Sequence, residues 1–221
     1  MALAYGADAV YLAGDAYGMR AFAGNFDREG LAHAVALAHG QGVRVHVTCN
    51  TLARNEEVAA LPGYLEYLDS IGVDAVIAAG VDVLYLCQRY APHVQVHMST
   101  QTGITNYEMV RMWHELGASR AILARELSLD EVAEICARAP RGMEVEAFVH
   151  GAMCVSVSGR CLLSNYMTGR DANRGACAQP CRYQYALMEE KRPGEYFPVF
   201  EEDGETFILN SRDMCMIDHV A

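Results

Sequence analysis

Short apolar runs alternate with longer amphipathic stretches along the first 150 residues of the chain. A glycine-led segment recurs three times, and in each copy a glycine suited to ending a helix precedes a short apolar run. Apolar runs without polar alternation are typical of parallel strands that are buried on both faces. Strands are therefore predicted within the three copies, 6–14, 72–80 and 117–125. Short segments rich in β-branched residues predict further strands over 43–49 and 94–98, and a clean alternation predicts one over 143–149.

Helical periodicity fills the intervals between these strands. The helix predicted last in the chain begins with a capping box at residues 128–131. Ile135 and Cys136 fall on its apolar face, so Cys136 is expected in the core rather than at a metal. Cys87 lies in a similar apolar helical setting and is expected in the core too. The predicted helices cover 27–40, 55–71, 81–91, 104–116 and 128–138.

Alternating strands and helices with right-handed crossovers predict a parallel sheet. We expect an α/β fold of the truncated TIM-like (β/α) barrel type, with an open flavodoxin-like sheet as the alternative. The chain starts and stops within predicted helices, which places the first strand and the closing βα units of the barrel outside it. Three parts are predicted: a partial barrel over 1–150, a cysteine-rich insertion over 151–182, and a C-terminal antiparallel β-hairpin segment over 183–221. A turn at Asp203-Gly204 and the start of the next barrel helix belong to the third part.

Composition favours a compact, non-membrane protein. Hydrophobic residues make up 52% of the chain and charged residues 20%, which is enough apolar material for a large core. No apolar run approaches the roughly 18 residues that a membrane span needs. The N-terminus lacks the basic region of a signal peptide, so we expect a cytoplasmic protein with reduced cysteines.

The net charge of −11 opposes nucleic-acid binding in general, but the charge is uneven. Residues 151–192 hold six basic and three acidic side chains, a local excess of three positive charges. This segment predicts a patch for an anionic substrate or RNA, with a solvated arginine-rich loop as the plain alternative. Its candidate substrate-binding residues are Arg160, Arg174 and Arg182.

Four of the eight cysteines lie within one short segment. Cys154, Cys161, Cys177 and Cys181 are spaced C-x6-C-x15-C-x3-C. Clustered thiolates select zinc, copper(I) or an iron–sulfur cluster. Zinc ribbons have tight cysteine pairs in both halves, whereas this segment has one, so the spacing favours iron–sulfur over structural zinc or unliganded cysteines. Cys215 is an alternative fourth ligand.

The residues around these cysteines resemble the collagenase-like peptidase family U32. Within the family the fullest similarity is to the branch that hydroxylates the wobble uridine of tRNA, and the resemblance extends over essentially the whole chain. The motifs that carry it lie at 6–11, 123–128, 146–154, 158–164, 173–182, 192–196 and 210–213.

This resemblance implies a barrel with a [4Fe–4S] cluster on Cys154, Cys161, Cys177 and, less firmly, Cys181, whose position varies between branches. It also implies an RNA-modifying hydroxylase that uses prephenate as the hydroxyl donor and tRNA as the partner. Family members include ribosomal RNA hydroxylases and ubiquinone hydroxylases that work as heterodimers. A redox or assembly subunit that binds a paralogous protein is therefore an alternative function.

Candidate catalytic residues lie at the predicted C-terminal ends of strands, where barrels place their chemistry. Arg125 can clamp a carboxylate or phosphate, and Glu126 or Glu146 can act as acid or base. His150 is a further catalytic candidate, and Gln101 a substrate-binding one. Each of three candidates has a structural alternative: Glu126 as the ion-pair partner of Arg125, Glu146 as a satisfied interior carboxylate, and Gln101 as a helix cap.

Proteolysis, which the family name implies, has weaker support in the sequence. The chain has no H-E-x-x-H zinc helix and no G-x-S-x-G elbow. His150 lies four residues before Cys154, so a cysteine nucleophile with a histidine base is conceivable. A peptidase is accordingly the alternative to the hydroxylase.

Overall fold

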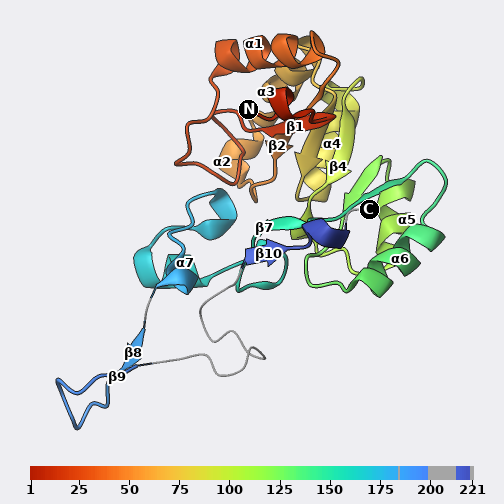
Figure 1. The fold of residues 1–221 in the computed structure, drawn as a ribbon. Coiled ribbons are helices and arrows are strands. Elements are labelled where there is room, and N and C mark those ends of the chain that lie inside the picture. The colour runs from red at the N-terminus through yellow and green to blue at the C-terminus, as the bar shows by residue number, and fades with distance from the viewer. Residues whose placement is uncertain (184, 199–212, 220–221) are drawn as a thin grey trace.

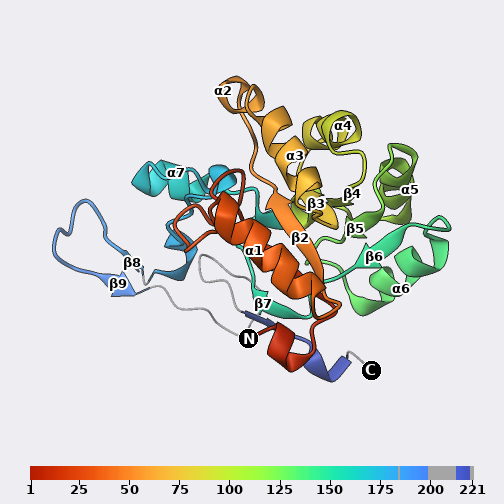
Figure 2. The same ribbon diagram turned by 90° about the horizontal axis from the view of Figure 1, so that it is seen from above.

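The computed structural model describes residues 1–183, 185–198 and 213–219. Its centre is a six-stranded parallel sheet in which every strand pairs with the strand that follows it in the sequence. The sheet curls into a half-barrel with helices on its outer side (Figures 1 and 2). The strands are β1 (Ala9–Leu12), β2 (Arg44–Cys49), β3 (Ala75–Ala78), β4 (Gln95–Met98), β5 (Arg120–Ile122) and β6 (Glu144–Glu146).

This strand order distinguishes the two folds that the sequence allowed. A flavodoxin-like sheet reverses direction after its first two strands, whereas a barrel adds each new strand on the same side. The order β1-β2-β3-β4-β5-β6 has no reversal, so the truncated barrel is confirmed. All six strands lie inside the predicted segments, although the predicted strand 143–149 is shortened to Glu144–Glu146.

Helices follow the strands at the predicted places. The segment predicted as one helix over 55–71 is divided, because Pro62 lies in the first turn of a new helix, where its missing N–H is tolerated. The capping box of the last barrel helix is present at Ser128 and Glu131. The helices are α1 (Arg28–His39), α2 (Asn55–Val58), α3 (Leu61–Ser70), α4 (Val81–Tyr90), α5 (Tyr107–Glu115) and α6 (Leu129–Arg138).

The prediction that Cys136 is a core residue is wrong. In α6 the side chain of Ile135 is buried, while Cys136 is exposed. Successive residues of a helix are rotated by about 100°, so Cys136 lies beyond the edge of a narrow buried stripe. Cys87 of α4 is buried, as predicted.

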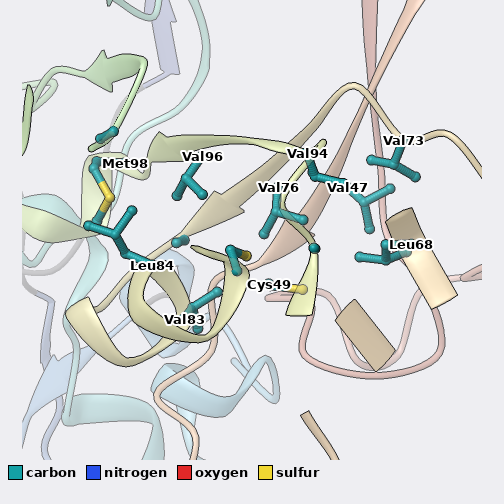
Figure 3. Close-up of a cluster of buried hydrophobic side chains, with 14 of the residues drawn as sticks. Val47, Cys49, Leu68, Val73, Val76, Val83, Leu84, Val94, Val96 and Met98 are labelled. Carbon is teal, nitrogen blue, oxygen red and sulfur yellow. The ribbon is translucent and has the colours of Figure 1, made fainter. Parts of the chain in front are cut away.

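The outer face of the sheet forms the hydrophobic core. Val47, Val76 and Val96 of the three central strands lie in one buried cluster with Leu68 of α3 and Leu84 of α4 (Figure 3). Successive side chains of a strand point to opposite faces of the sheet. Because these residues pack against the helices, the residues next to them in each strand point into the half-barrel.

The inner face is polar, whereas barrel interiors are usually filled by branched apolar side chains. His46 and His97 are each 1% exposed, and their rings meet edge to face with centroids 4.6 Å apart. The hydroxyl of Tyr11 in β1 donates to Glu146 in β6, and Arg120 Nη1 donates to Glu146 Oε2 at 2.8 Å. The two edge strands are thus joined across the interior of the curled sheet.

Beyond β6 the chain forms short antiparallel pairs. Strand β7 (His150–Ala152) pairs with β10 (Asp213–Cys215), and β8 (Ala186–Leu187) pairs with β9 (Phe197–Pro198). An antiparallel C-terminal part was predicted, but its turn at Asp203-Gly204 lies outside the described residues. Within the described ranges, the structure has no helix of the length and apolar character needed to cross a membrane.

The buried His97 predicts a pH dependence of stability. Burial, reinforced by the positive charge of Arg120, lowers the pKa of His97 to about 3 from its ordinary value of 6.5. The unfolded chain therefore takes up a proton first, and the stability contributed by neutral His97 is lost as the pH falls from about 6.5 towards about 3. We expect His97→Leu to flatten the fall of the urea unfolding free energy over this window. His33→Leu, at an exposed position of α1, is the control, and equal slopes for wild type and His97→Leu would contradict the prediction.

Candidate functional site

The cysteine-rich segment 151–182, here called the cap, lies against the C-terminal ends of the barrel strands (Figure 1). The amide of Leu52, after β2, donates to the carbonyl of Asn173 at 3.1 Å, and the amide of Ala21, after β1, donates to the carbonyl of Gly175 at 3.1 Å. Backbone pairing of this kind fixes the position of the cap on the loops that follow the first two strands.

Two arginines extend the attachment to the remaining central strands. Arg160 Nε donates to the carbonyl of Gln101 after β4 at 2.7 Å, and its Nη2 lies 3.5 Å from the carbonyl of Ala79 after β3. From the end of β5, Arg125 Nη1 donates to the carbonyl of Ala152 at 2.8 Å. The cap therefore spans the edge of the sheet at which barrel enzymes carry out their chemistry.

All four predicted ligand cysteines lie in the cap. Cys161 is 6% exposed, and the other three are partly buried. The amide of Leu163 donates to Cys161 Sγ at 3.3 Å, and the amide of Gln179 donates to Cys177 Sγ at 3.3 Å. Gln179 has a φ of 57°, a left-handed conformation that is uncommon for a residue with a side chain. Amide donors to sulfur stabilise thiolates and tune iron–sulfur centres.

Two of the other cysteines affect the pKa of Cys154. Burial raises the pKa of Cys154, and Cys161 and Cys181 raise it further, while the amide of Ser156 and the guanidinium of Arg125 lower it. The donor set suits a thiophilic centre. Within the described ranges, however, no three His, Cys, Asp or Glu side chains are gathered closely enough to coordinate a metal ion.

The alternative fourth ligand, Cys215, lies elsewhere. It is exposed on β10, opposite His150 of β7 in the antiparallel pair. Cys181, by contrast, is near enough to Cys154 to affect its pKa. The geometry thus favours Cys181 over Cys215 as the fourth thiol of the group.

The four predicted catalytic residues are placed in different surroundings. Glu146 is inside the half-barrel, engaged by Tyr11 and Arg120, while Arg125 lies at the cap. Glu126 and His150 are exposed. The structure does not bring these four side chains into one cluster, and their catalytic roles stay predictions.

The predicted substrate-binding residues also differ in their partners. Gln101 is buried and accepts a hydrogen bond from Ser99 Oγ at 3.1 Å. Arg174 pairs with Glu57 at 2.6 Å, and Arg182 pairs with Asp213 at 2.7 Å. Carboxylate partners offset the charges of these two arginines, which leaves less of their positive charge for a ligand.

Several interior residues were not predicted from the sequence. Tyr11, His46 and Arg120 each occupy an inward position in a strand, and their signal was a polar residue recurring at the same phase of successive strands. Phe22, which lies beneath the guanidinium of Arg170 at 4.5 Å, gave no signal because it belongs to an irregular loop.

A nucleophilic cysteine at position 154 has no support from the geometry. Catalytic thiols have a lowered pKa, produced by a neighbouring cation or base. Burial instead raises the pKa of Cys154, and His150 is exposed on β7.

Comparison with known proteins identifies similar sequences over the whole chain. The family model described as peptidase family U32 matches residues 1–221. The chain is 40% identical over 220 residues to tRNA hydroxylation protein P1 of Bacillus subtilis (strain 168), covering 100% of this chain and 51% of that protein. It is 34% identical over 258 residues to tRNA hydroxylation protein P of Escherichia coli (strain K12), covering 99% of this chain and 57% of that protein.

The fold has a counterpart among solved structures. The U32 peptidase Mk0906 superposes with a TM-score of 0.58 at 17% identity, covering 88% of this chain and 79% of that one. At this identity the likeness shows the fold alone. The chain spans about half the length of the two curated relatives.

The attachment of the cap to the barrel predicts that two glycine substitutions in the cap lower the free energy of unfolding by different amounts. Gly175 has a φ of +80°, and a Cβ there would lie 2.5 Å from the carbonyl oxygen of Gly18. Gly169 has a φ of +71°, with open space around its Cβ position. We expect Gly169→Ala to cost about 1–2 kcal/mol of unfolding free energy through backbone strain alone. Gly175→Ala adds a clash with the loop after β1, which costs about 1–3 kcal/mol more.

Urea unfolding measures both losses, and hydrogen exchange in residues 13–26 reports whether that loop detaches. Equal losses in the two variants, with unchanged exchange, would contradict the docking of the cap at Gly175.

Proposed function

This chain belongs to peptidase family U32, and we propose that it is an RNA hydroxylase that modifies the wobble uridine of tRNA at C5. The curated relatives named above, which are tRNA hydroxylation proteins, support this substrate. The observation that carries the proposal is the cysteine-rich cap on the C-terminal ends of the barrel strands. Because the chain spans about half of those relatives, the activity of the whole protein is part of the proposal. A tRNA enzyme of this kind would work in the cytoplasm.

We propose that the cofactor is a [4Fe–4S] cluster held by Cys154, Cys161, Cys177 and Cys181. The support consists of four thiol donors in one cap, amide donors to two of the sulfurs, and a guanidinium beside Cys154. A bound cluster would supply electron-transfer or ligand-binding chemistry.

The protein residues would position the reactants. Hydroxylation replaces the C5–H bond of uridine by a C–OH bond, and a donor alcohol that exchanges its C–O bond for a C–H bond balances the reaction in atoms and electrons. We propose prephenate as that donor. Its carboxylates match the positive charge of Arg125 and Arg160, which their backbone carbonyl partners do not cancel.

The cluster assignment predicts a specific response to cysteine substitution. Protein purified without oxygen is expected to contain about four iron and four sulfide per chain. Cys161→Ala removes a buried sulfur of the cap and should abolish the bound iron. Cys136→Ala, at an exposed position of α6, is the matched control and should leave the iron content unchanged. Colourless protein with stoichiometric zinc would rule out the cluster, and iron loss only in Cys136→Ala would show that the ligand set is wrong.

The substrate is tested by mass spectrometry of tRNA nucleosides from cells that lack the gene. We expect the wobble 5-hydroxyuridine derivatives to disappear, and to return with the wild-type gene but not with the Cys161→Ala variant. Unchanged nucleosides in a strain without paralogues would exclude the tRNA activity. Stable binding to a paralogous protein, without any change in RNA, would instead favour the redox or assembly subunit.

A further inference from the structure

The cap carries positive charge in a negatively charged protein. Residues 151–182 contain four arginines and one aspartate, whereas the net charge of the chain is −11. Arg125, Arg160 and Arg170 donate to backbone carbonyl oxygens, and over the described ranges none of them pairs with a carboxylate. A carbonyl partner orients a guanidinium without cancelling its charge, so these three arginines present fixed positive charge to an incoming anion.

Two of these arginines lie over exposed aromatic rings. The guanidinium of Arg170 lies 4.5 Å from the ring centroid of Phe22, which is 72% exposed. The guanidinium of Arg125 lies 5.6 Å from the ring centroid of Phe148, which is 38% exposed. Both rings therefore keep exposed surface on which a further planar group can stack.

Both arginine–aromatic stacks adjoin the cysteines. Arg170 Nη2 donates to the carbonyl of Cys177 at 3.2 Å, and Arg125 is close enough to Cys154 to influence its ionisation. The stacks therefore lie next to two different cysteines of the candidate site. A ligand that contacted both would pass over the cap between them.

A third apolar feature lies on the short cap helix α7 (Leu163–Thr168). Leu162, at its N-cap, is 76% exposed, and Tyr166, one turn further on, is 89% exposed. The amide of Tyr166 donates to the carbonyl of Leu162 at 2.9 Å, so the two side chains share one helix face. Arg170 is tied to the same helix, because Ser164 Oγ donates to its carbonyl at 2.8 Å.

We propose that Phe22, Phe148 and Tyr166, together with Arg125 and Arg170, form a recognition surface for unpaired RNA. This inference rests on the proposed function and specifies the form of its substrate. Unpaired bases can stack on aromatic rings, while arginines neutralise the phosphates between them. In a duplex the bases are stacked inside the helix and cannot reach such rings.

The same surface fits a protein partner less well. A protein covering the recognition surface would bury the two guanidinium charges of Arg125 and Arg170, which have no carboxylate partner within the described residues, and burying unpaired charge is costly. Phosphates supply the missing negative charge, and a base needs to leave its stack before an enzyme can reach C5. Charge complementarity therefore selects RNA as the occupant.

The test measures binding of two fluorescent RNAs to the full chain by anisotropy, one a hairpin with an unpaired loop and the other a fully paired duplex. We expect tighter binding of the hairpin. Phe22→Ala and Phe148→Ala should each weaken hairpin binding about tenfold through the loss of one stacked base. Tyr166→Ala is a third, independent variant that should weaken hairpin binding as well, and because Tyr166 is 89% exposed on α7 its removal leaves the packed core intact.

Tyr85→Ala is the matched control. Tyr85 of α4 is 56% exposed and lies under the guanidinium of Arg89 at 5.4 Å, which reproduces the same stack on the outer helix layer away from the cap. Its affinity for the hairpin should equal that of wild type.

The outcomes separate the inference from the proposed function. Wild-type affinity in all three aromatic variants, or equal binding of hairpin and duplex, would overturn the recognition surface while leaving tRNA hydroxylation in place. No binding of either RNA by wild type, together with unchanged tRNA nucleosides in the deletion strain, would overturn both.

Discussion

The structure depends on one constraint: the strands commit one face to the helices, so the sheet can bury its other face only by curling on itself. The outward side chains of β2, β3 and β4 are valines, cysteine and methionine that pack under α3 and α4. The inward side chains close the curl through polar contacts, with Tyr11 of β1 and Arg120 of β5 meeting at Glu146 of β6. An ion pair enclosed in this way adds little to the folding stability, because both charges lose their hydration. Its main effect is to hold the strands that carry it in place, since Glu146 ties β6 to both β1 and β5 across the interior of the sheet.

Local signals explain why so much of the fold could be predicted. Glycine stops, apolar runs and the capping box at Ser128 each act within a few residues, and the six strands and their helices were found from them. Cys136 was misplaced because the width of a buried helix stripe depends on what packs against the helix, which is not a local property. The order of the strands was left open between barrel and open sheet for the same reason, and pairing across the sheet decided it.

The candidate site was predictable in its composition but not in its contacts. The spacing of the cysteines grouped four thiols in one segment, and the structure places all four in the cap, whereas the partners of the arginines lie far away in the sequence. Arg174 meets Glu57 from 117 residues away, and Arg160 meets Gln101 from 59 residues away. Contacts between residues so far apart cannot be predicted from a short segment of sequence. The arginines of the cap therefore could not be told apart from the sequence alone. The structure divides them into those paired with carboxylates and those held by carbonyl groups.

The arginines that are held by carbonyl groups link the attachment of the cap to the charge around its cysteines. A group of thiolates carries negative charge that a partly buried site has to balance. An arginine paired with a carboxylate contributes little to that balance. An arginine held by a backbone carbonyl is fixed in its orientation and keeps its full positive charge. Arg125 illustrates both effects, since it fastens the cap through Ala152 and also opposes the rise that burial causes in the pKa of Cys154. Arg125 and Arg160 therefore fasten the cap to the barrel and at the same time place positive charge at the C-terminal ends of the strands, although the chain as a whole carries a net charge of −11.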